Sequence, residues 1–170
     1  MCHNGVPEGQ PADPLGEAPQ QLYSDNHFHH IGVPFNREIP DVQKGEKTGL
    51  AGHVTSVIPG MYRTPTLRNA SKGVGPDFTK AYTHNGWFKS LESLVHFYNT
   101  RDVKTKCETL GIVDATEKEA LANDCWPQAE FPGQAVFVVG NLGLTADEEA
   151  SLVAYMKTFD DEHTPTKPQP

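Results

Sequence analysis

Apolar residues recur at helical spacing in two parts of the chain, and both parts lie in its second half. The first predicts a helix over residues 91–99 with Ser90 as its N-cap. The second predicts a helix behind Thr145, where the letters TADE form a capping box. The apolar faces of these helices consist of Leu91, Leu94, Val95 and Tyr98 in the first, and of Leu152, Val153, Met156 and Phe159 in the second.

Regular structure is sparse in the rest of the chain. A shorter helix is predicted after Thr116, where TEKE forms another capping box. Residues 4–48 and 49–89 are interrupted by many of the 15 glycines and 14 prolines, so we expect long loops there. The acidic, proline-containing segment 160–170 predicts a disordered tail. We therefore predict a mainly α domain over 1–159 with few helices and long loops.

Composition limits the classes of partner. The 170 residues fit one domain. A hydrophobic fraction of 36% is low, so a buried prosthetic group would help to stabilise the core. A formal net charge of −8 argues against nucleic acids and anionic membranes as partners, and it can attract a basic protein. The sequence contains no apolar run long enough for a membrane span and no visible signal peptide.

The residues Cys2 and His3 resemble the end of a Cys-x-x-Cys-His haem-attachment motif without its first cysteine. In such a motif the cysteine forms a thioether to haem, and the histidine binds iron. We therefore expect the chain to belong to a longer c-type cytochrome. Cys107 and Cys125 are either two free thiols or a disulfide, and we favour the disulfide because haem c and disulfides both form in oxidising compartments.

Further motifs resemble the carboxyl-terminal haem domain of bacterial di-haem cytochrome c peroxidases, a family that includes the tyrosine-ligated enzyme of methylamine utilisation. The motifs are NHFHHIGVP at 26–34, RTPTLRN at 63–69, YTHNG at 82–86, LESLVHFYN at 91–99 and LGLT at 142–145. The resemblance implies a cytochrome c-like fold whose loops wrap a covalently attached haem c. It also implies the six-coordinate, electron-transferring half of a peroxidase-like oxidoreductase, while the peroxide-binding haem belongs to an amino-terminal domain that is missing here.

The resemblance makes His3 the proximal iron ligand and places Tyr98 where electron-transferring members carry methionine. An anionic phenolate would stabilise ferric and higher-valent iron. Met61 is the competing ligand, and its use would make the protein a simple mono-haem electron carrier. A third alternative is a haem-free binding module in which the Cys2-His3 pair is accidental.

The resemblance also assigns supporting residues. Arg68, and to a lesser degree Arg63, are candidates for binding haem propionates, and His84 is a candidate for a supporting or propionate contact. Thr79 and Ala81 occupy positions whose backbone carbonyls bind calcium in the family, although the family usually has proline at the second position.

Partners and compartment follow from the same resemblance. We expect an electron donor or a protein substrate, and a periplasmic location. The histidines at 27, 29 and 30 do not predict zinc, because no cysteine or carboxylate cluster accompanies them in the sequence.

Overall fold

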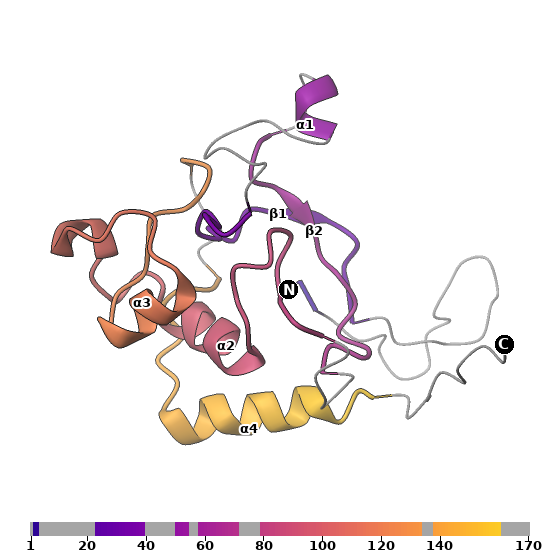
Figure 1. Ribbon diagram of the computed structural model, residues 1–170. Helices are drawn as coiled ribbons and strands as arrows, with labels where there is room; N and C mark the ends of the chain where they lie inside the picture. The colour runs from indigo at the N-terminus through magenta and orange to yellow at the C-terminus, as the bar shows by residue number, and fades with distance from the viewer. Residues whose placement is uncertain are drawn as a thin grey trace, which may run out of the picture.

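A computed structural model of the chain describes residues 2–3, 23–39, 50–54, 58–71, 79–133 and 138–160. Within these ranges helices carry most of the regular structure (Figure 1). Apart from its first residue, the tail predicted over 160–170 lies outside the described residues. The elements are β1 (Phe28–His29), α1 (Leu50–His53), β2 (Tyr62–Arg63), α2 (Leu91–Thr100), the 3-10 helix η1 (Cys107–Leu110), α3 (Glu117–Ala122) and α4 (Ala146–Lys157).

The three predicted helices are confirmed, together with their N-caps. Ser90 accepts a hydrogen bond from the Ser93 amide at the start of α2. Thr116 and Thr145 each form a complete capping box at the start of α3 and α4. These caps satisfy amide groups that have no partner inside a helix, and this explains why the helices begin at these residues.

The apolar stripe predicted for α4 is only partly correct. Val153 and Met156 are buried against Leu91 and Val95 of α2, and the two helices lie side by side (Figure 1). Leu152, in contrast, is 39% exposed. Among the described helices, the main packing partner of α4 is α2, so the buried stripe is narrower than the apolar pattern of the sequence.

Helix α2 is buried on a second side that the predicted stripe did not contain. Phe97 is fully buried on this side, among aromatic rings from the segments before and after α2. Trp87 and Trp126 pack edge-on in the same cluster, and each indole N–H has an acceptor: the Ala115 carbonyl for Trp87 and the Thr100 hydroxyl for Trp126. Satisfied indoles can be buried at little polar cost.

A disulfide between Cys107 and Cys125 closes the segment that contains η1 and α3. Both cysteines are almost completely buried in the aromatic cluster. The Cys107 amide also donates to the Trp126 carbonyl, so the disulfide and this backbone hydrogen bond hold the same two segments of the chain together. This pairing is the one that the sequence favoured.

Polar side chains fix the approach of α4 to α2. Asn99 donates to the Leu144 carbonyl at 2.8 Å and to Glu149 at 2.5 Å, and it accepts from the Leu144 amide at 3.0 Å. His96 lies 3.0 Å from both carboxylate oxygens of Glu149. These contacts hold the carboxyl-terminal end of α2 against the first turn of α4.

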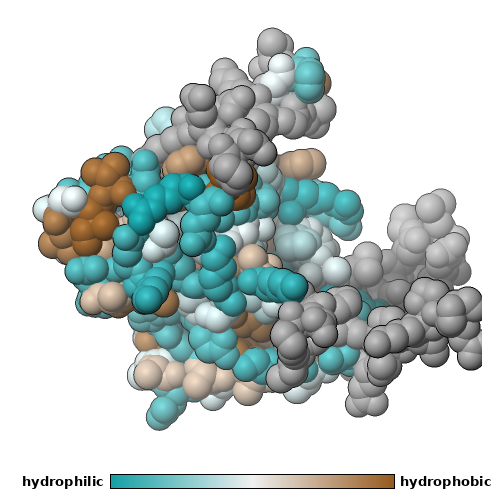
Figure 2. Space-filling model, viewed as in Figure 1, coloured by the Kyte–Doolittle hydropathy of each residue, from teal (hydrophilic) through white to brown (hydrophobic). Residues whose placement is uncertain are grey.

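The surface is mostly hydrophilic on the face shown in Figure 2, with an apolar patch at the end of the molecule where η1 lies. Leu110 and Val113 are exposed there. None of the helices in the described ranges is both long and apolar enough to cross a membrane. The cytochrome c-like fold stays a prediction, because the helices and loops seen here do not define it alone.

Candidate functional site

The imidazole of His3 is oriented by the chain that follows the amino-terminal segment. Its Nδ1 lies 2.8 Å from the Tyr23 carbonyl oxygen. A carbonyl can only accept, so Nδ1 carries the proton and Nε2 keeps its lone pair. Metal-binding histidines are commonly held in this way, with one ring nitrogen donating to a carbonyl and the other free for the metal. The orientation of His3 therefore suits a ligand role.

Cys2 lies against the same segment. The Asp25 amide donates to the Cys2 carbonyl at 2.8 Å, and the ligand atoms of Cys2, Asp25 and His29 lie within 4.8 Å of one another. Burial and the charge of Asp25 raise the pKa of the Cys2 thiol. The thiol is therefore held neutral, a state that disfavours a thiolate bond to a metal ion.

Asp25 is itself an organised carboxylate. Desolvation raises its pKa, but hydrogen bonds from the His27 amide, His29 and Thr64 outweigh this effect and keep the pKa below its usual range. The contact with His29 is short, at 2.6 Å. The cluster corrects the sequence analysis, which found no cysteine or carboxylate near the histidines at 27, 29 and 30. The fold supplies both from outside that run.

Tyr98 approaches this cluster from α2. Its phenol is half-buried and close enough to Cys2 for their charges to interact. Burial is the largest cause that raises the pKa of Tyr98 to about 12, the charge of Cys2 adds to it, and Arg101 opposes it. No hydrogen bond to the phenol oxygen is found among the residues that the structure describes. The structure therefore brings the predicted ligand Tyr98 near the predicted attachment residue Cys2.

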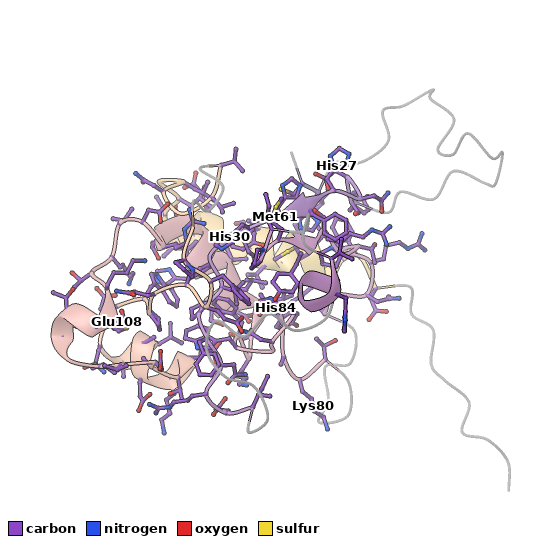
Figure 3. All side chains as sticks on the ribbon, turned by 90° about the horizontal axis from the view of Figure 1, so that it is seen from above. His27, His30, Met61, Lys80, His84 and Glu108 are labelled. Atoms are coloured by element: carbon purple, nitrogen blue, oxygen red, sulfur yellow. A yellow bond between two sulfur atoms is a disulfide. The ribbon has the colours of Figure 1, made fainter. Side chains whose placement is uncertain are left out.

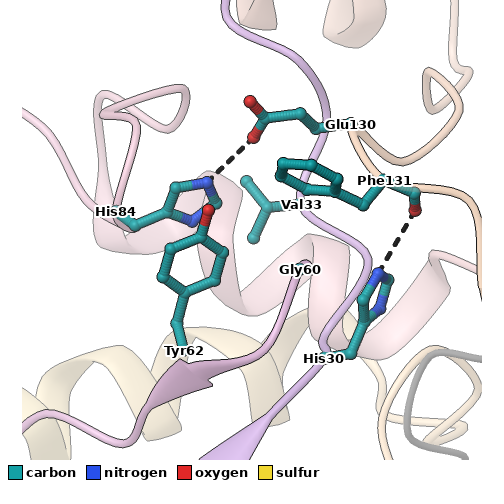
Figure 4. Close-up of a pocket in the computed structure, with 7 residues that line it drawn as sticks. All are labelled: His30, Val33, Gly60, Tyr62, His84, Glu130 and Phe131. Carbon is teal, nitrogen blue, oxygen red and sulfur yellow. Dashed lines mark hydrogen bonds and ion pairs between the residues drawn. The ribbon is translucent and has the colours of Figure 1, made fainter. Parts of the chain in front are cut away.

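A small pocket lies on another side of the segment 30–33, lined by seven residues (Figure 4). His84 lies 2.9 Å from the buried carboxylate of Glu130 through Nε2, and its ring stacks on Tyr62 with centroids 3.5 Å apart. The side-chain amide of Asn85 also donates to the Glu130 carboxylate, at 3.2 Å. Burial and the charge of Glu130 raise the pKa of Tyr62 to about 12. The lining residues are His30, Val33, Gly60, Tyr62, His84, Glu130 and Phe131.

The motif at 82–86 explains why His84 points into this pocket. The Tyr82 amide donates to the Phe88 carbonyl at 2.7 Å and closes a tight loop. Thr83 has a φ of +70°, which is rare for a β-branched residue, and Gly86 has a φ of +63°. The strained turn places His84 within hydrogen-bond distance of Glu130.

His30 is buried on the opposite wall of the pocket. Its Nε2 donates to the Phe131 carbonyl at 3.2 Å, which leaves Nδ1 as a buried acceptor without a hydrogen-bond partner in the described part of the chain. Gly60 makes room for the ring: a Cβ at this position would lie 2.3 Å from the His30 Cδ2, and its φ is +83°. Figure 3 shows that Met61 follows on the same side of the molecule as His30.

The remaining predicted residues lie outside the Cys2 cluster and are not among the residues that line the pocket. Arg63 is exposed and donates to the Asn26 side chain at 2.5 Å, and Arg68 is exposed as well. Thr79 is half-buried and Ala81 is exposed. Propionate binding by the two arginines, calcium binding by the two carbonyls and iron binding by Met61 stay predictions.

Sequence reasoning did not identify Asp25, Arg101 or Glu130. Asp25 lies one position before the recognised motif at 26–34. Its position two residues before a histidine gave no signal that Cys2 would be its neighbour. Arg101 and Glu130 are buried charges, a class that is rare without a partner, but their partners are distant in the sequence.

The residues at the Cys2 cluster fit a covalently attached haem. A neutral thiol suits thioether formation, and an imidazole whose Nδ1 carries the proton suits iron binding through Nε2. Near the thiol lies a phenol for which the described residues supply no hydrogen-bond partner. The same residues fit a thiolate-bound metal ion less well, because burial and Asp25 both oppose loss of the thiol proton.

Comparison with known proteins finds a weak similarity to a cytochrome c peroxidase. A cytochrome-c peroxidase named IdrP2, from Denitromonas iodatirespirans, is 28% identical over 142 residues. The match covers 71% of this chain and 33% of the relative, so the chain spans about one third of that protein's length. No family model and no solved structure matches the chain.

Proposed function

We propose that this chain is a haem c-containing oxidoreductase domain, similar to the six-coordinate, electron-transferring half of a di-haem cytochrome c peroxidase. Cys2 attaches the haem, and His3 and Tyr98 bind its iron. One observation carries the proposal: a half-buried phenol without a hydrogen-bond partner among the described residues lies near the thiol that adjoins an oriented imidazole. The similarity to a cytochrome-c peroxidase supports the same class of protein.

A haem c bound here would supply one-electron redox chemistry. The chain contributes the environment. Tyr23 fixes the proton of His3 on Nδ1, so that Nε2 keeps the lone pair a metal ligand needs. Because burial raises the pKa of Tyr98 to about 12, the phenol ionises at neutral pH only beside a strong positive charge, which a ferric ion provides.

The remaining assignments extend this proposal. We place the domain in the periplasm, next to an amino-terminal haem domain that binds peroxide, with an electron donor or a protein substrate as partner. Arg63 and Arg68 reach haem propionates, and Thr79 and Ala81 offer carbonyls to calcium. His84 has a supporting role in which Glu130 orients its imidazole. The distance of 2.9 Å between His84 Nε2 and the Glu130 carboxylate supports this assignment.

The proposal is tested by maturing the chain with haem in an oxidising compartment. We expect a c-type pyridine haemochrome, and in the ferric state we expect a phenolate-to-iron charge-transfer band. Tyr98→Phe removes this band, whereas the matched variant Tyr155→Phe, at an exposed position of α4, keeps it. Cys2→Ser removes covalent attachment without removing the imidazole of His3.

Each alternative gives a different result. A methionine-to-iron charge-transfer band in the near infrared, lost in Met61→Leu, would replace the proposal by a mono-haem electron carrier. A colourless protein would contradict haem binding and would favour the third alternative, a haem-free binding module. An unchanged spectrum in Tyr98→Phe would show that Tyr98 is not a ligand of the iron.

A further inference from the structure

The buried guanidinium of Arg101 connects three separate parts of the chain. Its side chain is 5% exposed. It donates from Nη1 to the Ile31 carbonyl at 2.9 Å and from Nη2 to the Val139 carbonyl at 2.8 Å. It also forms a bidentate pair with Asp102, at 2.8 Å from Nε and 2.6 Å from Nη2. Arg101 directly follows α2, so the end of this helix is tied to two distant segments.

Both connected segments contact the proposed iron ligands. Ile31 belongs to the segment 23–39, whose Tyr23 holds the imidazole of His3. Val139 precedes Gly140, whose amide donates to the Tyr98 carbonyl at 2.5 Å. The contacts of Arg101 therefore join the part of the chain that orients one ligand to the part that carries the other.

The backbone at Gly140 is shaped around this arrangement. The Asp102 amide donates to the Gly140 carbonyl at 2.8 Å. A Cβ at Gly140 would lie 2.3 Å from Asp102 Oδ2 and 2.8 Å from Arg101 Nη2, and the φ of this residue is +108°. Only glycine allows the chain to approach the ion pair so closely.

The position of the charge matters as well as its hydrogen bonds. Burying a guanidinium costs free energy that a merely structural contact between apolar residues would avoid. Arg101 lies close enough to Tyr98 to favour the ionised phenol. Lys106 contributes a second cation nearby, since its ammonium lies 3.3 Å from the Arg101 carbonyl, and the carboxylate of Asp102 opposes both.

We propose that Arg101 is the positioning residue for Tyr98: it holds the end of α2 against residues 31 and 139 so that the phenol reaches the iron bound by His3. This inference rests on the proposed function. Arginine suits the role because its planar fork donates to several acceptors at fixed angles, whereas the ammonium of lysine is a single point charge.

The test uses the full chain matured with haem, in wild-type form and as Arg101→Gln, Arg101→Lys and Arg37→Gln. The last variant is the control, since Arg37 forms a bidentate pair with Glu119 on the surface. We measure the phenolate-to-iron charge-transfer band and the low-temperature EPR spectrum of the ferric protein. Far-UV circular dichroism and thermal unfolding report the fold independently.

We expect the ratio of Tyr98-bound to Tyr98-free iron to fall about tenfold in Arg101→Gln, as expected for the loss of a charge-assisted hydrogen bond. Arg101→Lys should show a smaller loss at unchanged helix content, because it keeps the charge but not the fork. Arg37→Gln should match the wild type. If Arg101→Gln does not fold, Arg101→Lys decides the question.

The failures are distinct. A charge-transfer band that persists in both Arg101 variants would overturn this inference and leave the proposed function intact. A wild-type protein without the band would overturn the proposed function, and this inference with it. A band lost equally in Arg37→Gln would show a general effect of surface charge and would also overturn the role of Arg101.

Discussion

Alkaline pH tests the environment of Tyr98 in the haem-free chain. Burial, and next the charge of Cys2, raise the pKa of this phenol to about 12 from a usual value of 10.0. The folded protein therefore holds the phenolic proton more tightly than the unfolded chain does. It follows that this contribution to the free energy of unfolding is complete below about pH 10 and is lost as the pH rises toward about 12.

The size of the effect follows from the shift. Two pKa units correspond to about 2.7 kcal/mol when the loss is complete. At about pH 11 the unfolded phenol is largely ionised and the folded one is not, so about 1.4 kcal/mol of stability has been lost. Tyr98→Phe has no phenolic proton at this site. Its free energy of unfolding should therefore fall by about 1.4 kcal/mol less than that of the wild type when the pH is raised to about 11.

Urea unfolding of the wild type, Tyr98→Phe and the exposed-site control Tyr155→Phe, at about pH 9 and about pH 11, measures the difference. Tyr62 titrates in the same range and contributes equally to all three proteins. The control should behave like the wild type. Equal losses in the wild type and in Tyr98→Phe would refute the claim that the phenol lies in a desolvated site.

Three further changes test the fold by urea unfolding. Reducing the disulfide between Cys107 and Cys125, with a sequence separation of 18, should lower the free energy of unfolding by about 3 kcal/mol, and the double alanine variant should then be insensitive to reductant. Asn99→Ala removes three hydrogen bonds of a buried side chain to half-buried partners at the start of α4 and should cost about 3 kcal/mol. The exposed variant Asn123→Ala, which loses one hydrogen bond to the Glu119 carbonyl, should cost clearly less. Gly60→Ala should cost about 2 kcal/mol or more, because of its positive φ and the contact with His30.

Signals confined to a few neighbouring residues were the ones that the sequence revealed. The caps at Ser90, Thr116 and Thr145 act within one helical turn, so their residues stand together in the sequence. Burial depends on what packs from elsewhere. Phe97 was missed and Leu152 was wrongly placed in the core, because periodicity alone does not show how many neighbours a helix has.

The candidate site followed the same division. Cys2, His3 and Tyr98 were predicted because each stands in a recognisable motif. The long-range polar contacts were not predicted, since the partners are far apart in the sequence: His84 was predicted without Glu130, which lies 46 positions away, and Arg101 and Ile31 are 70 apart. Such contacts are set by the tertiary fold, and no local pattern encodes them.

Under the proposed function, the electrostatic environment of Tyr98 favours a phenolate bound to iron. The Cys2 thiol carries a potential negative charge, and that charge is one cause of the raised pKa of Tyr98. A thioether cannot ionise, so attachment of the haem excludes this charge at every pH, as the raised pKa of the thiol does near neutral pH. Arg101 already favours the phenolate, and ferric iron adds a positive charge on the same side of the balance. A Cys2 thiolate would oppose the phenolate, and burial and Asp25 both disfavour that thiolate.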